Sequence, residues 1–202
     1  MARAHLSVLS LALLVTFVTG CATMTPEQCQ HASWMDVGLR DGLEGQPMST
    51  LDERLSDCKK VGIAVDTGRY VTGREQGLQT YCRLDNAITL GLSGATYSGV
   101  CPPMVDADFR RLYAKGYAVF ELRAEVMNLD ARSGSLQYQL RDADRDEDKQ
   151  LRETEKDEDR QRIRKEFDQR RYRLRSELAD LDHRMRRARD ALRFAEFALR
   201  SP

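Results

Sequence analysis

The residues best suited to carry chemistry in this sequence are its cysteines, of which the 202-residue chain has five. An odd number leaves one thiol over when the others pair as disulfides. Cys21 follows an apolar run, whereas the other four lie further along the chain, at Cys29, Cys58, Cys82 and Cys101. We therefore predict that Cys21 is the cysteine without a disulfide partner and that the other four form disulfides. The sequence has no CxxC spacing, and the histidines beyond residue 20 are His31 and His183, so no metal site is predicted.

Residues 1–20 have the pattern of a secretory signal peptide. Arg3 supplies a positive charge, and ten of the thirteen residues from Leu6 to Val18 are apolar. This run is too short to cross a bilayer as a stable helix. The four residues that follow its core, Val18-Thr19-Gly20-Cys21, resemble the bacterial lipoprotein signal, in which an aliphatic residue and two small residues precede a cysteine.

The lipoprotein resemblance implies cleavage before Cys21 and acylation of both its sulfur and its new amino terminus. Each buried methylene contributes about 0.8 kcal/mol, so several acyl chains, palmitate among them, make the anchor close to permanent. Ala22 follows the cysteine where Asp would otherwise stand, which in Gram-negative lipoproteins is typical of an outer-membrane destination. We predict a lipidated tether over residues 21–25, anchored in the outer membrane and facing the periplasm. A secretory signal cut nearby is the alternative.

The four remaining cysteines are expected to form two disulfides in an oxidising periplasm. Three pairings are possible, and the sequence does not choose among them. We favour Cys29 with Cys58 and Cys82 with Cys101, because each pair closes a short loop. Closing a loop of about twenty residues stabilises a fold by around 3 kcal/mol.

Residues 26–104 are predicted to form a small helical domain that carries these cysteines. Thr25-Pro26-Glu27-Gln28 predicts a helix start with a capping box, residues 50–53 repeat that pattern, and Asp66 is expected to cap a third helix. Gly45 and Gly62 are expected to end helices. Residues 84–100 contain three glycines among Ser and Thr, which favours a disulfide-tied loop with a short hairpin.

Two of the predicted helices carry glycines spaced about four residues apart after an aromatic residue. The first has Trp34, Gly38 and Gly42, and the other has Tyr70, Gly73 and Gly77. Glycine inside a helix costs about 0.5–1 kcal/mol relative to alanine, so two on one face indicate close backbone contact. Charged residues between these glycines exclude a bilayer span. We interpret both faces as helix-to-helix packing, and a ligand groove is the less favoured alternative.

The rest of the chain is predicted to be a helix over residues 105–132 and a long charged helix over 133–202 that forms a coiled coil. Two stripes of apolar residues alternate steps of three and four, the second of them running without a miss from Leu174 to Leu199. Gly and Pro are absent from Ser135 to Ser201, so one helix of about 65 residues, roughly 100 Å, is expected. We favour a continuous rod; a hairpin bending at Ser133-Gly134-Ser135 is the alternative.

Charge is unevenly distributed along this rod. Residues 142–159 hold ten acids and four bases, whereas residues 160–200 hold fourteen bases and seven acids. An antiparallel second copy would bring opposite signs together, so a homo-oligomer, or an envelope protein bound to the C-terminal helix, is the expected partner. The zero net charge of the whole chain removes the simplest argument for nucleic acid.

The spacing of cysteines, glycines and aromatic residues is similar to that of the bacterial lipoprotein family called domain of unknown function 2799. The resemblance covers about residues 26–104 and part of the following helix, and it is carried by Cys29, Trp34, Gly38, Asp41, Gly42, Gly45, Cys58, Gly62, Tyr70, Gly73, Gly77, Leu78, Tyr81, Cys82, Gly91, Gly94, Tyr97, Gly99, Val100, Cys101 and Pro102. It implies an envelope lipoprotein and supplies no known chemistry.

These patterns together predict a mainly α, non-catalytic lipoprotein that acts as a structural or interaction protein in the envelope and needs no cofactor. One alternative is a binder of anionic wall polymer or lipopolysaccharide, because the guanidinium groups of the Arg-rich C-terminal helix suit phosphate. A less favoured alternative is an enzyme that uses Asp36, Asp41, Glu44 or Glu75 in acid/base work. Carboxylates on adjacent helical turns are more often solvated or capping, and no His or nucleophile is positioned beside them.

Overall fold

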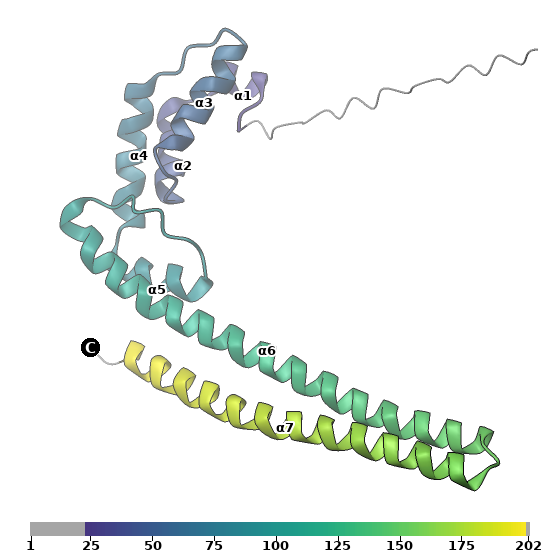
Figure 1. Ribbon diagram of the computed structural model, residues 1–202. Helices are drawn as coiled ribbons and strands as arrows, with labels where there is room; N and C mark the ends of the chain where they lie inside the picture. Colours follow the sequence, from purple (N-terminus) through teal and green to yellow (C-terminus); the bar gives the residue numbers. More distant parts are fainter. Residues whose placement is uncertain (1–22, 201–202) are drawn as a thin grey trace, which may run out of the picture.

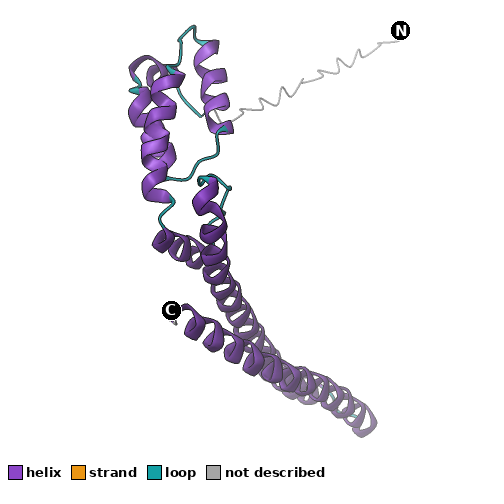
Figure 2. Cartoon of the chain, turned by 90° about the vertical axis from the view of Figure 1, so that its left-hand side faces the viewer, coloured by secondary structure: helices purple, strands orange, loops and turns teal. Residues whose placement is uncertain are grey.

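The computed structural model of the protein describes residues 23–200, and every regular element in that range is an α-helix (Figures 1 and 2). The helices are α1 (Pro26–His31), α2 (Trp34–Leu43), α3 (Ser49–Lys60), α4 (Thr67–Tyr81), α5 (Leu84–Ser93), α6 (Pro103–Glu153) and α7 (Asp157–Arg200). The predicted fold class, mainly α, is confirmed. The predicted signal peptide and Cys21 lie outside the described residues.

The helices form a small bundle joined to a long hairpin. Helices α1 to α4 pack together, α5 lies on the first part of α6, and α7 runs back antiparallel to α6 (Figure 1). The hairpin extends away from the bundle in both views (Figure 2). At 1.5 Å per residue, the 51 residues of α6 span about 77 Å, so the hairpin sets the longest dimension of the molecule.

Two of the three predicted helix starts are present. The Thr25 hydroxyl accepts a hydrogen bond from Gln28 N at 3.2 Å, Gln28 Oε1 accepts one from Thr25 N at 2.7 Å, and Asp66 Oδ1 accepts one from Arg69 N at 3.0 Å. The start predicted at residues 50–53 is wrong, because α3 begins at Ser49 without a side-chain cap. The first predicted helix is split in two at residues 32–33, because α1 packs on α3 whereas α2 packs on α4.

The predicted glycine faces of α2 and α4 pack against each other. A Cβ added to Gly38 would lie 2.0 Å from the carbonyl oxygen of Tyr70, and one added to Gly73 would lie 2.0 Å from that of Met35. Gly42 and Gly77 make equally close contacts, at 2.2 Å from Arg74 O and 2.3 Å from Leu39 O. Only glycine permits the two backbones to approach this closely, so these four residues determine how α2 and α4 cross.

A second glycine contact joins α5 to α6. The loop predicted over residues 84–100 is therefore wrong for its first part, because Leu84–Ser93 forms α5. A Cβ on Gly91 would lie 2.3 Å from Tyr113 O, and one on Gly116 would lie 2.5 Å from Ile88 O. Gly94 ends α5 in the left-handed conformation, with φ of 73°. Gly91, one of the glycines that favoured a loop, therefore packs α5 against α6. Leu84–Ser93 is helical because α6 covers it.

The long C-terminal segment is a helical hairpin, not a continuous rod, and the bend is not at residues 133–135. Helix α6 passes through Gly134 without interruption, and the break falls at residues 154–156. The predicted division into helices over 105–132 and 133–202 is therefore wrong. A glycine costs a helix only about 1 kcal/mol. Leu129 and Leu136, on either side of Gly134, are buried against α7, and their burial outweighs that cost.

The hairpin turn is built from local hydrogen bonds and charge. Thr154 has an extended backbone, and its hydroxyl donates to Gln150 O at 2.7 Å. Arg160 donates to the carbonyl oxygens of Leu151 and Thr154, which would otherwise be left unsatisfied at the end of α6. Three acids, residues 157–159, begin α7, where negative charge is favourable. This acidic triplet is the signal in the sequence that could have placed the turn.

The two apolar stripes, which predicted self-association, pack on each other within one chain. Leu129 and Leu136 of α6 and Leu174, Leu181, Met185 and Ala188 of α7 form one buried cluster. Opposite charges also meet inside the chain, since Arg171 pairs with Glu147 and with Asp144, and Arg123 Nη2 lies 2.7 Å from Glu196 Oε1. Hydrogen bonds to Glu147 and then to Asp168 raise the pKa of Arg171. The antiparallel charge matching expected between two copies is thus satisfied by α6 and α7.

Candidate functional site

The start of the described chain is fixed to α3 by a single carboxylate. Asp57 Oδ2 accepts hydrogen bonds from Thr23 N at 2.8 Å and from the Thr23 hydroxyl at 2.9 Å, while Asp57 Oδ1 lies 2.9 Å from Lys60 Nζ. Hydrogen bonds from Lys60, then from Thr23, hold the pKa of the Asp57 carboxyl well below its usual range. Met24 is buried beside them. Thr23 and Met24, which the sequence analysis placed in a tether over residues 21–25, therefore contact the bundle.

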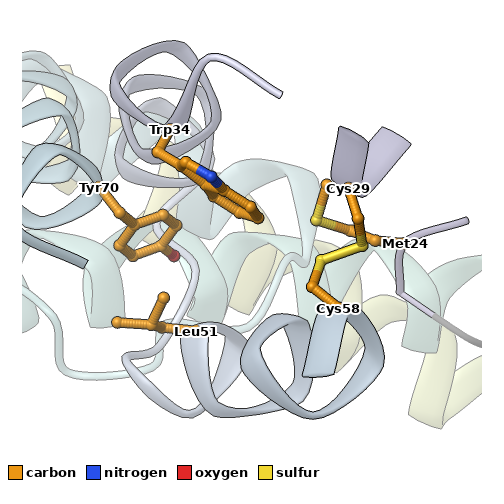
Figure 3. Close-up of a cluster of buried hydrophobic side chains, with 6 residues drawn as sticks. All are labelled: Met24, Cys29, Trp34, Leu51, Cys58 and Tyr70. Atoms are coloured by element: carbon orange, nitrogen blue, oxygen red, sulfur yellow. A yellow bond between two sulfur atoms is a disulfide. The ribbon is translucent and has the colours of Figure 1, made fainter. Parts of the chain in front are cut away.

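The first hydrophobic core includes Met24, the residue after Thr23. Cys29 of α1 is bonded to Cys58 of α3, and the disulfide packs near Met24 (Figure 3). Trp34, Leu51 and Tyr70 complete the buried cluster, so the four helices α1 to α4 and Met24 share one core. Since α1 is only six residues long, the disulfide is its main link to the rest of the bundle.

The second core lies where α4, α5 and α6 meet. Cys82 is bonded to Cys101, so the structure has the pairing that closes the shorter loops. Phe109 is fully buried there, and the Tyr97 ring packs on it with centroids 4.7 Å apart. The Tyr97 hydroxyl donates to Asp106 Oδ1 at 2.5 Å, and burial together with that hydrogen bond raises the pKa of Tyr97 to about 12. This core orients the hairpin relative to the bundle.

A buried ion pair and a hydrogen bond connect α2, α3 and α4. Asp41 is 1% exposed, and its carboxylate accepts from Arg54 Nε at 2.9 Å, from Arg54 Nη2 at 2.6 Å and from the Tyr70 hydroxyl at 2.7 Å. Burial and the hydrogen bond to Asp41 raise the pKa of Tyr70 well above its ordinary value. No sequence pattern predicted this cluster, because Arg54 lies 13 residues and Tyr70 lies 29 residues from Asp41.

A cleft of about 760 Å³ opens above Arg54, between α1, α2 and α3. We call it the Arg54 cleft. Its wall carries Asp36 and Arg40 on successive turns of α2 and Glu44 directly after the helix, and Arg54 and Asp41 lie at its base. Glu27 and His31 of α1 line another side, together with Thr23. Acidic and basic side chains therefore line the same cleft as Thr23, which is hydrogen-bonded to Asp57.

The carboxylates considered as catalytic groups are only partly brought together. Asp36, Asp41 and Glu44 all line the Arg54 cleft, whereas Glu75 lies on α4 and does not. Asp41 is the buried member, and its oxygens are occupied by Arg54 and Tyr70. Asp36 and Glu44 are exposed. The oxygens of Asp41 are therefore committed to the ion pair and the Tyr70 hydroxyl, whereas Asp36 and Glu44 face the cleft.

The hairpin presents a basic and aromatic surface on the half of α7 nearest the turn. A shallow hollow there is lined by residues of α7 alone, among them Arg164, Lys165, Tyr172 and Arg173, which we call the Tyr172 patch. The Tyr172 side chain is 75% exposed. Asp168 also lines the hollow, but it is paired with Arg171, so the bases of the patch are left in excess.

Within residues 23–200 no group of three or more His, Cys, Asp and Glu is arranged to hold a metal ion. None of the helices described over this range is long and apolar enough to cross a bilayer.

The two disulfide-linked cores, the glycine contacts and the projecting hairpin define a class of small helical proteins in which a cysteine-tied bundle carries an α-hairpin. Residues 33–118 match the model of the family described as Protein of unknown function (DUF2799). The match confirms the resemblance seen in the sequence. It spans α2 to α5 and the first third of α6, so most of the hairpin lies outside it.

A curated protein is similar to about half of the chain. The chain is 28% identical over 109 residues to the Uncharacterized protein YfiL of Escherichia coli (strain K12), a match that covers 52% of this chain and 84% of that protein. No solved structure matches the chain.

Proposed function

We propose that the protein is a non-catalytic lipoprotein of the bacterial outer membrane, whose bundle lies at the bilayer and whose hairpin carries an interaction surface into the periplasm. The observation that carries this proposal is the attachment of Thr23 to Asp57, two residues after Cys21. A chain acylated at Cys21 would hold the bundle directly against the membrane. The hairpin turn lies at the opposite end of the molecule from α1 (Figure 1), so it would point away from the bilayer.

The disulfides and the hairpin dimensions support this proposal. Two disulfides in a chain of this size are typical of an oxidising compartment such as the periplasm. A hairpin about 70 Å long would place the Tyr172 patch well beyond the headgroups. Because the apolar stripes are used within the chain, a homo-oligomer or an envelope partner would have to bind the outer faces of α6 and α7.

Replacing Cys21 with serine is expected to release the protein from the membrane fraction almost completely, because the thioether and the acyl chains require this residue. The check is fractionation of cells, with mass spectrometry of the amino-terminal peptide of the wild-type protein. The variant Ala22→Asp is the matched control, since it should stay acylated but move to the inner membrane. An unmodified thiol at Cys21, or equal membrane recovery of wild type and Cys21→Ser, would contradict the proposal.

A second function, binding of anionic wall polymer or lipopolysaccharide, is favoured by the Tyr172 patch. Guanidinium groups pair with phosphate or carboxylate in two-pronged geometry, and an exposed tyrosine ring offers a stacking surface for a sugar. Arg164 and Arg173 have no ion-pair partner within residues 23–200, so both are open to an external anion. The patch lies on the half of α7 next to the hairpin turn, which is the end of α7 farther from α1 (Figure 1).

Co-sedimentation with purified peptidoglycan, and separately with lipopolysaccharide, tests this second function. The double variant Tyr172→Ala/Arg173→Glu is expected to lose about tenfold in bound fraction at low salt, and the binding of the wild type should weaken as salt rises. The matched control is Tyr138→Ala/Arg141→Glu, which changes an exposed tyrosine and arginine on α6. Binding that is insensitive to salt, or equal losses in both double variants, would reject the patch as the binding surface.

A further inference from the structure

The α2 wall of the Arg54 cleft holds two opposite charges that do not pair with each other. Asp36 precedes Arg40 by four residues, the spacing at which such pairs usually form on a helix. Within residues 23–200 neither side chain makes a hydrogen bond or an ion pair. A carboxylate and a guanidinium, one helical turn or about 5.4 Å apart, are therefore both open to a ligand.

The base of the cleft supplies a second guanidinium in a fixed position. Arg54 uses Nε and one hydrogen of Nη2 to bind Asp41, which leaves its other edge for the cleft. Its side chain is 17% exposed and is held by a carboxylate that is itself 2% exposed. Little side-chain freedom would be lost when this edge binds an anion, because the ion pair already orders the guanidinium.

The summed charge of the lining sets the kind of ligand. Four carboxylates face two guanidinium groups around the cleft, at Glu27, Asp36, Asp41, Glu44, Arg40 and Arg54. A ligand with negative charge alone would meet a net negative surface, whereas a ligand that joins an anionic group to a cation matches both signs. We propose that the Arg54 cleft binds a phosphoethanolamine headgroup, with its phosphate on Arg40 and Arg54 and its ammonium on Asp36.

The position of the cleft makes a membrane lipid the source of this headgroup. Thr23 lines the cleft and is held by Asp57, and Ala22 alone separates it from Cys21. Two residues of chain reach at most about 7 Å, so an acyl group on Cys21 would keep the mouth of the cleft in the headgroup layer. This step rests on the lipid anchor proposed above.

The same contacts predict selectivity among phospholipids. The primary ammonium of phosphatidylethanolamine can donate a hydrogen bond to Asp36, and a charge-assisted bond of this kind is a strong one. The trimethylammonium of phosphatidylcholine has no N–H to donate. Phosphatidylglycerol has no cation, so its headgroup would leave the carboxylates of the cleft unpaired. Phosphatidylethanolamine is therefore the expected occupant.

Two measurements on the full mature chain test the proposal. Calorimetric titration with O-phosphoethanolamine is expected to show saturable binding that weakens at least about tenfold in Asp36→Asn/Arg40→Gln. The control Asp108→Asn/Arg111→Gln changes an exposed pair on α6 and should bind as the wild type does. In nanodiscs, backbone amides of α2 should exchange hydrogen more slowly with phosphatidylethanolamine than with phosphatidylcholine, and the cleft variant should abolish this difference.

Each outcome bears on a different claim. Equal titration curves for the wild type and the cleft variant would overturn the site. Saturable binding of O-phosphoethanolamine without any difference between the two nanodisc lipids would overturn the lipid as occupant and favour a soluble zwitterion. An unmodified Cys21 would overturn the proposed anchor, and the soluble titration would still decide whether the cleft recognises this headgroup chemistry.

Discussion

Replacing Gly73 with alanine is expected to lower the free energy of unfolding of the bundle by about 2–3 kcal/mol. The added Cβ would lie 2.0 Å from Met35 O and 2.9 Å from Leu39 N, and both atoms belong to backbone that cannot move aside alone. The two helices must separate or shift, which costs more than the roughly 1 kcal/mol that alanine contributes to helix propensity. Urea unfolding followed by the fluorescence of Trp34, the single tryptophan, measures the change.

The controls for this prediction lie in the same chain. Gly68 is on the same helix, and a Cβ there would meet only Asp66 Oδ1, at 3.6 Å, so Gly68→Ala is expected to change stability by less than about 0.5 kcal/mol. Gly134 has nothing within 4 Å, and Gly134→Ala should stabilise the hairpin by up to about 1 kcal/mol. A loss in Gly73→Ala no larger than in Gly68→Ala would contradict the close packing of α2 on α4.

Removing the charge of Asp41 is expected to destabilise the bundle about as much as Gly73→Ala does. The variant Asp41→Asn should lower the free energy of unfolding by about 3 kcal/mol. The substitution leaves Arg54 without its partner in a largely buried position and weakens the hydrogen bond from the Tyr70 hydroxyl. Breaking a buried pair from one side costs about 3–5 kcal/mol, because the remaining charge is uncompensated. Arg54 keeps some contact with water, which places the expected loss at the lower end.

The comparison that isolates this effect uses one exposed carboxylate and one double variant. Glu75→Gln, on α4, should change stability by less than about 0.5 kcal/mol. The double variant Asp41→Leu/Arg54→Met should lose less than Asp41→Asn, because it removes both charges together. Thermal unfolding of the four proteins gives the ranking. If Asp41→Asn matches Glu75→Gln, or the double variant is the least stable, the ion pair does not stabilise the bundle.

Local patterns in the sequence predicted the elements well where neighbouring residues decide the outcome. The capping box at Thr25 and the cap at Asp66 succeeded because a side-chain oxygen and an amide three residues away are enough to start a helix. The glycine faces also succeeded, since a glycine that costs helix stability must have a packing reason. The loop predicted over residues 84–100 is wrong for the complementary reason, because Gly91 makes a helix contact with α6 and not a turn.

The hairpin shows why long helices are harder to predict. Gly134 was the evident weak point, but its cost is small beside the apolar contacts that α7 makes on both sides of it. The actual turn lies in a run of charged residues, where neither stripe can build a core and where Arg160 satisfies the carbonyl oxygens at the end of α6. That contact exists only after the chain has folded back.

The sequence alone determined that the protein is helical, that its cysteines divide into one and four, and that two helices carry glycine faces and two segments carry apolar stripes. These properties depend on periodicity and on hydrogen bonds between residues a few positions apart. The tertiary structure alone decided which cysteines pair, that the stripes meet within one chain, and that Asp41, Arg54 and Tyr70 share one site. Those outcomes depend on contacts between distant segments, which no local pattern encodes.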